Sequence, residues 1–209
     1  MLRITEIFYS LQGETSFVGL PTVFIRLTGC PLRCQYCDTA YAFSGGTKMS
    51  QEEILEKVAA YKPRYITVTG GEPLAQKACL PLLKSLCDLY TVSLETSGAI
   101  DVSEVDPRVV KILDLKTPGS DEVDKNIYEN INYLNRHDQI KFVICNHHDY
   151  EWTKQKIAEY DLSRFEILLS PSHDQLPAKD LAQWIIEDNL PVRMQLQMHK
   201  YIWGDEKGR

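Results

Sequence analysis

Residues 22–39 of the chain, TVFIRLTGCPLRCQYCDT, carry the pattern that decides its fold. The β-branched run Thr22–Leu27 predicts a strand, and the loop after it holds Cys30, Cys34 and Cys37 with the spacing C-x3-C-x2-C. Structural zinc sites and fully protein-capped iron–sulfur clusters take four protein ligands, so three thiolates leave one metal position open. Spacing alone leaves three interpretations: a 4Fe–4S cluster with one accessible iron, a zinc ion completed by a distant histidine or aspartate, or incidental cysteines.

The composition is that of an ordinary globular protein. The 209 residues are 44% hydrophobic and 25% charged, which suits one domain with a sizeable core. The net charge is −6 and no Lys/Arg-rich block occurs, so we expect no nucleic-acid partner. The N-terminus lacks a secretory pattern and no apolar stretch reaches about 18 residues, so we expect no membrane contact and a cytoplasmic location.

Six cysteines in a cytoplasmic chain favour metal or thiol chemistry over disulfides. Three of them lie outside the cysteine loop, in or beside a predicted helix (Cys79 and Cys87) or at a predicted strand end (Cys145). A buried thiol behaves as a small apolar side chain, and we expect that role for these three.

Short apolar runs alternate with amphipathic runs along the chain. Strands are predicted at Leu2–Tyr9, Thr22–Leu27, Arg64–Val68, Thr91–Leu94, Val109–Leu113, Ile140–Ile144, Phe165–Leu169 and Val192–Leu196. Helices are predicted at Ser50–Tyr61, where Ser50 and Glu53 form a capping-box pattern, and at Cys79–Leu89, Val123–Leu134, Tyr150–Glu159 and Leu176–Ile186.

This alternation predicts an α/β fold with a mostly parallel sheet. The chain is shorter than the roughly 250 residues of a complete eight-stranded barrel, so we favour a partial, abbreviated (β/α) barrel over a flat doubly wound sheet. Polar motifs follow most of the predicted strands: TGC, TGGEP, ETSG, DLKTPG, SPSHD and QMHK. Because ligands of parallel α/β folds bind at the carboxyl ends of the strands, these motifs are expected to share one face with the cysteines.

The cysteine loop resembles that of the radical S-adenosylmethionine superfamily. Tyr36 stands where the superfamily has an aromatic residue, and TGGEP at Thr69–Pro73 resembles its GGE motif, although alone it would equally suit a turn between strand and helix. The resemblance implies a 4Fe–4S cluster held by three cysteines, an open iron that chelates S-adenosylmethionine, and a 5′-deoxyadenosyl radical that abstracts a substrate hydrogen. It also implies that residues 1–209 form a single radical S-adenosylmethionine domain, with 204–209 as a polar tail.

Two terminal runs narrow the resemblance. With RLTGC, CDT and TGGEP, the runs EIFYSLQGET (residues 6–15) and LQMHKYIW (residues 196–203) resemble the 7-carboxy-7-deazaguanine synthase family, radical S-adenosylmethionine lyases of queuosine and 7-deazapurine biosynthesis. The resemblance implies ring contraction of 6-carboxy-5,6,7,8-tetrahydropterin to 7-carboxy-7-deazaguanine with loss of ammonia. It further implies Mg²⁺, a homodimer, and a reducing electron donor such as flavodoxin or ferredoxin.

The same resemblance suggests roles for individual residues. S-adenosylmethionine would be bound by Tyr36, Gly71, Glu72, Ser97, Asp114, Leu115, Lys116, Ser170, Pro171, Ser172 and His173. The pterin would be bound by Leu11, Gln12, Gly13, Glu14, Arg26, Thr69 and His199. The hydroxyl of Thr39 would bind Mg²⁺, a hard cation that prefers oxygen; its alternative role is to cap the next turn.

Elementary chemistry supports two of these assignments. The amide of Gln12 and the carboxylate of Glu14 together offer the donors and acceptors that an aminopyrimidinone edge needs. Arg26, a lone cation in an apolar strand, can bind a substrate carboxylate through two parallel hydrogen bonds, or it can form a structural ion pair. Asp38 is expected to hold the cysteine loop by hydrogen bonds to backbone groups, rather than to bind metal.

Some features depart from the family or favour other functions. Thr15 stands where the family usually has glycine, and the tail GDEKGR is expected to be solvated, with no role for Arg209. A radical activase of a partner protein shares the cysteine spacing and GGEP, but the runs SLQGE and LQMHKYIW argue against it. A zinc-binding module without catalysis is the alternative of another class.

Overall fold

One curved sheet organises the molecule. The computed structural model describes residues 1–204, 206 and 208. Within them nine strands lie in the order β3-β1-β2-β4-β5-β6-β7-β8-β9. Their bounds are β1 Leu2–Leu11, β2 Pro21–Leu27, β3 Thr47–Met49, β4 Tyr65–Gly70, β5 Thr91–Thr96, β6 Val110–Asp114, β7 Gln139–Ile144, β8 Glu166–Pro171 and β9 Arg193–Met194.

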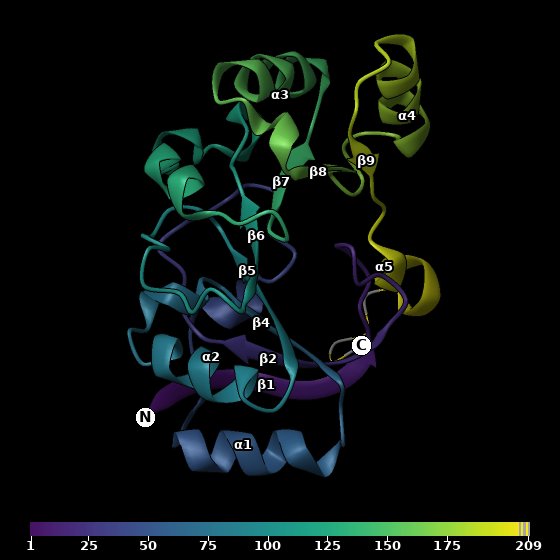
Figure 1. Ribbon diagram of the computed structural model, residues 1–209. Helices are drawn as coiled ribbons and strands as arrows, with labels where there is room; N and C mark the ends of the chain where they lie inside the picture. The colour runs from purple at the N-terminus through teal and green to yellow at the C-terminus, as the bar shows by residue number, and fades with distance from the viewer. Residues whose placement is uncertain (205, 207, 209) are drawn as a thin grey trace.

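The sheet is parallel from β2 through β4 to β9, and only β1 pairs antiparallel with its neighbours β2 and β3. The strands trace an arc that does not close (Figure 1). The predicted partial, abbreviated barrel is therefore confirmed, and the flat sheet is not what forms.

Helices cover the outer side of the arc (Figure 1). The α-helices are α1 Gln51–Ala60, α2 Cys79–Cys87, α3 His147–Glu159, α4 Ala178–Glu187 and α5 Met198–Trp203; short 3-10 turns span Ala40–Phe43, Pro73–Ala75, Pro118–Ser120 and Leu162–Arg164. The last of the α-helices, α5, lies in the gap between the two ends of the sheet, where Met198 N–H donates to the Gly13 carbonyl at 3.1 Å. No helix in the described part of the chain combines the length and apolarity that crossing a membrane requires.

The α1 helix forms as its sequence predicts. The Ser50 hydroxyl accepts from Glu53 N–H, and the Glu53 carboxylate accepts from Ser50 N–H, which completes the capping box. Ile54 and Val58 on its inner face are completely buried against the sheet, where the hydrophobic core lies.

The predicted helix at Val123–Leu134 is wrong. The segment forms two 3-10 turns, Val123–Lys125 and Tyr128–Tyr133. Between them, the Asn126 side chain accepts from Lys116 N–H and donates to the Lys116 carbonyl, both at 2.8 Å. Asn130, in the second turn, likewise bonds backbone groups of the preceding loop. Asparagine side chains that bond the backbone in this way compete with helix formation, which the apolar spacing does not reveal.

Three further local differences lie near the chain's ends and edges. The strand expected at Val192–Leu196 covers only Arg193–Met194, while β3 and α5 were not expected at all. Both missed elements are short, and β3 is stabilised by its pairing with Leu2–Ile4 rather than by its own sequence pattern.

A β-bulge in β1 decides which side chains reach the inside of the arc. Ile4 pairs with Leu27, but Glu6 rather than Thr5 pairs with Arg26, so one extra residue is inserted in β1. Before the bulge, Leu2 and Ile4 belong to the core on the helical side. After it, Ile7 takes that side, and Phe8 faces inward, stacked on Phe24 with ring centroids 4.9 Å apart. Bulges re-aim side chains in this way beside functional sites.

Candidate active site

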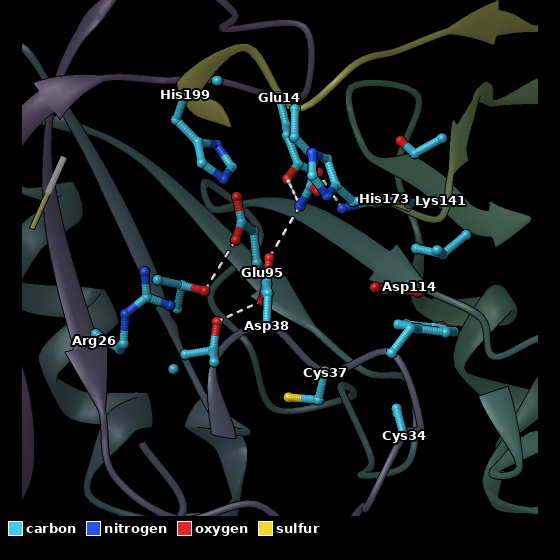
Figure 2. A pocket seen from close by; sticks show the side chains of 18 of the residues that line it. Glu14, Arg26, Cys34, Cys37, Asp38, Glu95, Asp114, Lys141, His173 and His199 are labelled. Carbon is cyan, nitrogen blue, oxygen red and sulfur yellow. Dashed lines mark hydrogen bonds and ion pairs between the residues drawn. The ribbon is translucent and has the colours of Figure 1, made fainter. Parts of the chain in front are cut away.

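A cavity of about 610 Å³ occupies the inside of the curved sheet. Figure 2 shows Glu14, Glu95, Arg26 and His199 directed into the same space as Cys34 and Cys37. Twenty of the predicted site residues line it: Leu11, Gln12, Gly13, Glu14, Arg26, Cys30, Cys34, Tyr36, Cys37, Thr39, Thr69, Gly71, Ser97, Asp114, Lys116, Ser170, Pro171, Ser172, His173 and His199. Glu72 and Leu115 do not line the cavity, because both are completely buried within the protein.

The three loop cysteines are free thiols, partly buried at one side of the cavity. Burial raises the pKa of all three, that of Cys34 to about 11, so assembly of a metal site would release protons. Among the described residues, no group of three His, Cys, Asp or Glu side chains is gathered around a single point as for one metal ion. A 4Fe–4S cluster binds each cysteine through a different iron, so a loop of three separate soft donors fits it.

The GGE motif packs against the backbone at the start of the cysteine loop. A Cβ on Gly71 would lie 2.3 Å from the Gly29 carbonyl oxygen, so only glycine permits this approach. Glu72 N–H donates to the same carbonyl at 2.8 Å. The close approach that Gly71 permits is to the backbone that leads into Cys30.

The Glu72 side chain is fully engaged by protein donors. Its carboxylate accepts from Thr96 Oγ1 at 3.0 and 3.1 Å, from Ser97 N–H and Oγ at 2.7 and 2.6 Å, and from Leu74 N–H at 2.9 Å. This network ties the end of β4 to the end of β5.

Beside the cysteines lie buried polar atoms that have no partner among the described residues: the Tyr36 hydroxyl, Asp114 Oδ1 and Ser170 Oγ. Buried polar atoms without partners are rare in folded proteins, and these three line the cavity, which indicates a polar ligand there. Lys116 Nζ pairs with Asp114 Oδ2 at 3.0 Å. Burial alone would lower the Lys116 pKa, but Asp114, Tyr36 and Cys34 outweigh it and hold the pKa well above its usual value.

The opposite side of the cavity carries carboxylates and an amide. The Gln12 amide donates to Glu95 Oε1 at 3.3 Å, and the Thr69 hydroxyl donates to Glu95 Oε2 at 2.9 Å. Burial, and then the neighbouring Glu14, raise the pKa of Glu95. Lys141 Nζ donates to Glu14 Oε2. Burial opposes ionisation of Glu14, but this ammonium prevails and the Glu14 pKa is lowered.

We call this side of the cavity, with Gln12, Glu14, Thr69, Glu95 and Lys141, the floor, and the two ends of the chain meet there. A Cβ on Gly13 would lie 2.8 Å from His199 Nδ1, so the glycine lets α5 pack directly on the loop after β1. Burial lowers the pKa of His199, which favours the neutral imidazole.

Arg26 carries an ion pair and still reaches the cavity. Its Nε donates to Glu6 Oε1 at 2.7 Å. The structural ion pair that the sequence left as an alternative is therefore present, in the same side chain that lines the cavity.

Thr39 and Asp38 lie where the cysteine loop meets the floor. The Thr39 hydroxyl donates to Asp38 Oδ1 at 2.7 Å, and Gln197 Nε2 donates to Asp38 Oδ2 at 3.1 Å and to Glu14 Oε1 at 3.2 Å. Thr39 makes no side-chain capping bond to the 3-10 turn that follows it. Asp38 is held by side chains rather than by the backbone bonds we expected.

Sequence reasoning missed several polar residues of the cavity, among them Glu95, Lys141 and Gln197. Glu95 begins the ETSG motif, and Gln197 lies in LQMHKYIW, so their motifs were available as signals. Lys141 stands inside an apolar strand, as Arg26 does, and that pattern would have found it. In the tail, Gly204, Glu206 and Gly208 also line the cavity, whereas Asp205, Lys207 and Arg209 lie outside the described residues.

Comparison with known proteins agrees with the geometry. Residues 24–160 match the family described as "Radical SAM superfamily". The chain is 46% identical to the 7-carboxy-7-deazaguanine synthase of Chlorobaculum tepidum, over 98% of this chain and 96% of that protein. It belongs to the 7-carboxy-7-deazaguanine synthase family. The resemblance inferred from the sequence motifs is thereby confirmed, and the superfamily implies a 4Fe–4S cluster and S-adenosylmethionine.

Other members of the family and its superfamily support this placement. The 7-carboxy-7-deazaguanine synthase of Koribacter versatilis is 41% identical over 98% of both chains. The crystal structure of QueE from Escherichia coli superposes with a TM-score of 0.76 at 26% identity, covering 95% of this chain and 94% of that one. Streptococcus suis SuiB bound to S-adenosylmethionine has a TM-score of 0.58 at 13% identity over 81% of this chain and 48% of that one, and shares the fold.

Proposed function

We propose that this chain converts 6-carboxy-5,6,7,8-tetrahydropterin into 7-carboxy-7-deazaguanine with loss of ammonia, as a radical S-adenosylmethionine lyase of queuosine and 7-deazapurine biosynthesis. The observation that carries the proposal is that one cavity joins a three-thiol loop to a wall of groups complementary to a carboxylated pterin. When bound, the cluster and S-adenosylmethionine supply the 5′-deoxyadenosyl radical that removes a hydrogen atom from C6 of the substrate.

On the thiol side, Cys30, Cys34 and Cys37 would hold the cluster. The unpartnered buried atoms of Tyr36, Asp114 and Ser170 support a polar cofactor there, and the Lys116 ammonium can meet its carboxylate. Gly71, Ser97, Pro171, Ser172 and His173 line the same part of the cavity. Glu72 and Leu115 would contribute by holding the neighbouring strand ends in place, because neither residue lines the cavity.

On the floor, the ionised Glu14 and the carboxyl of Glu95 would accept hydrogen bonds from the amino group and ring N–H of the pterin. Gln12 and Thr69 already donate to Glu95 and would position it. Leu11, Gly13 and His199 would complete the wall around the ring, and the Arg26 guanidinium would bind the substrate carboxylate.

Mg²⁺ and its ligand Thr39 are also part of the proposal. The Thr39 hydroxyl lines the cavity next to the Asp38 carboxylate, and hard oxygen donors suit a cation that keeps several positions for water and substrate. We further propose a cytoplasmic homodimer reduced by a flavodoxin or ferredoxin. That all six cysteines are free agrees with a reducing compartment.

An anaerobic turnover assay tests the proposal. The reconstituted protein is mixed with S-adenosylmethionine, Mg²⁺, a strong reductant and the carboxypterin, and the products are followed by mass spectrometry. We expect 7-carboxy-7-deazaguanine and ammonia in equal amounts. Abundant 5′-deoxyadenosine without deazaguanine would retain the radical chemistry but reject this substrate, as a protein activase would require. A colourless zinc protein without iron would reject both.

A further inference from the structure

The bulge in β1 brings Glu6 opposite Arg26, and the resulting cluster determines how that guanidinium is presented. Without the extra residue, Thr5 would pair with Arg26 and Glu6 would face the helical side with Ile25. The bulge therefore places a carboxylate on the inner face, in a strand whose inward neighbour is the aromatic Phe8. This carboxylate does not itself line the cavity.

Two donors converge on a single oxygen of Glu6. Arg26 Nε and the Tyr41 hydroxyl both donate to Glu6 Oε1, each at 2.7 Å. The side chains of Glu6 and Arg26 are 20% and 16% exposed, so the pair is largely withdrawn from water. Charge-assisted hydrogen bonds of this kind are stronger than neutral ones.

Two aromatic rings lie near the Arg26 guanidinium. The Arg26 Cζ atom lies 5.9 Å from the ring centroid of Phe8 and 5.9 Å from that of Tyr41. A guanidinium has five N–H groups in a rigid planar fork. Because Nε is bonded to Glu6, the two terminal nitrogens are the donors with which Arg26 can serve the cavity that it lines.

We propose that Glu6 is a positioning residue for substrate recognition, which holds Arg26 so that its terminal nitrogens grip the carboxylate of the pterin. This inference rests on the proposed function. It assigns Glu6 an effect specific to the substrate carboxylate, because other residues, Gln12, Glu14 and Glu95, would hold the pyrimidinone half. Tyr41 assists by anchoring Glu6.

Binding of two ligands under anaerobic conditions tests this role. The probes are 6-carboxy-5,6,7,8-tetrahydropterin and 5,6,7,8-tetrahydropterin without the carboxylate, titrated by calorimetry into the reconstituted protein with S-adenosylmethionine present. Glu6→Gln keeps the size of the side chain and removes its charge. We expect the Kd and KM for the carboxylated pterin to rise about 10- to 100-fold, the effect of losing one charge-assisted hydrogen bond, with little change in kcat. The Kd for the pterin without the carboxylate is expected to stay within about twofold.

Two further variants serve as controls for this interpretation. Tyr41→Phe removes one of the two donors to Glu6 and is expected to raise the KM less, about two- to fivefold. Glu166→Gln breaks a comparable glutamate–arginine pair, with Arg193, away from the cavity, and is expected to change neither affinity. Thermal unfolding and iron content of each variant are measured alongside, so that general damage is recognised.

The outcomes separate the inference from the function on which it rests. If wild-type protein turns over the carboxypterin and Glu6→Gln leaves its Kd unchanged, or weakens both pterins equally, the positioning role is overturned. If wild-type protein binds neither pterin, the proposed substrate is wrong and the inference falls with it. Selective weakening of the carboxylated pterin supports both.

Discussion

The two sides of the cavity are built on different principles. The thiol side follows the carboxyl ends of parallel strands: the cysteine loop after β2, GGE after β4, ETSG after β5 and the Asp114 segment after β6. The floor combines side chains of the parallel strands, namely Thr69, Glu95 and Lys141, with the end of the antiparallel strand β1 and with α5 from the other end of the chain. The thiol side thus lies where parallel α/β folds generally bind their ligands. The floor is an addition to that face, and we propose that it selects the substrate.

The comparison shows that radical chemistry and substrate recognition depend on different residues. Radical S-adenosylmethionine chemistry needs one loop and its support by neighbouring strand ends, and SuiB, at 13% identity, shares the fold. Recognition of a particular pterin needs residues from positions 6–26 and 197–199 to meet, and Gln197 links the two sides by bonding both Glu14 and Asp38. Variants on each side should therefore damage different functions.

The largest effect is expected on the thiol side. Cys34→Ala removes one of three cluster ligands, so turnover should fall below detection, and iron content and visible absorbance should drop with it. The pterin-binding floor is untouched, and affinity for the pterin without S-adenosylmethionine should stay within about threefold of wild type. Cys87→Ala, on α2 away from the cavity, is the matched control. Full iron content in Cys34→Ala would contradict the cluster assignment.

The second effect separates the floor from the thiol side. Lys141→Met keeps the length of the side chain but leaves the buried Glu14 carboxylate unpaired, so we expect kcat/KM to fall about 100-fold, or roughly 2.7 kcal/mol. Stability should fall by about 3 kcal/mol, because breaking a buried pair exposes an uncompensated charge to the interior. Urea unfolding, iron content and kinetics are measured together.

The double variant Lys141→Met/Glu14→Gln serves as its control. Removing both charges should restore much of the stability without restoring activity. Equal stability of Lys141→Met and wild type would show that the ion pair does not form in solution, and a loss of iron would show that the two sides are not independent.

A third, smaller effect tests the junction of the two sides. Thr39→Ala removes the hydroxyl beside Asp38, and we expect the stimulation of turnover by Mg²⁺ to weaken about tenfold. A magnesium titration of initial rates measures it. Thr47→Ala, an exposed position of β3, should behave as wild type. An unchanged titration in Thr39→Ala would remove Thr39 from the metal site.

The smallest effect concerns the turn that shapes the floor. Thr15 has a φ of +66°, a left-handed conformation that favours glycine, and is almost completely buried. Thr15→Gly relieves about 1–2 kcal/mol of strain but costs about 0.5–1 kcal/mol of chain entropy, so net stability should change by no more than about 1.5 kcal/mol. Activity should stay within about twofold, since the backbone already has the glycine conformation. A large loss of pterin affinity would mean that the Thr15 side chain itself shapes the site.

Several parts of the molecule followed from local patterns. The capping box of α1 and the strand before the cysteines depend on neighbours in sequence, and both formed as predicted. The segment at Val123–Leu134 did not, because Asn126 bonds Lys116, ten residues earlier in the chain, and no periodicity reports such a bond. Lys141 and Glu95 lie inside strands, and their value to the site depends on which side chains lie opposite them in the folded protein.

The sequence by itself indicated the chemistry of this protein, because the three thiols of one short loop, taken together with the GGE motif, resemble the radical S-adenosylmethionine superfamily. It also determined the family, through motifs at both ends of the chain. Only the tertiary structure decided that Glu72 supports the loop instead of facing the cavity, that Lys141 keeps Glu14 ionised, and that a bulge brings Glu6 to Arg26. These facts depend on strand register and on the packing of the two chain ends, and an extra residue in β1 reverses which side chains point inward.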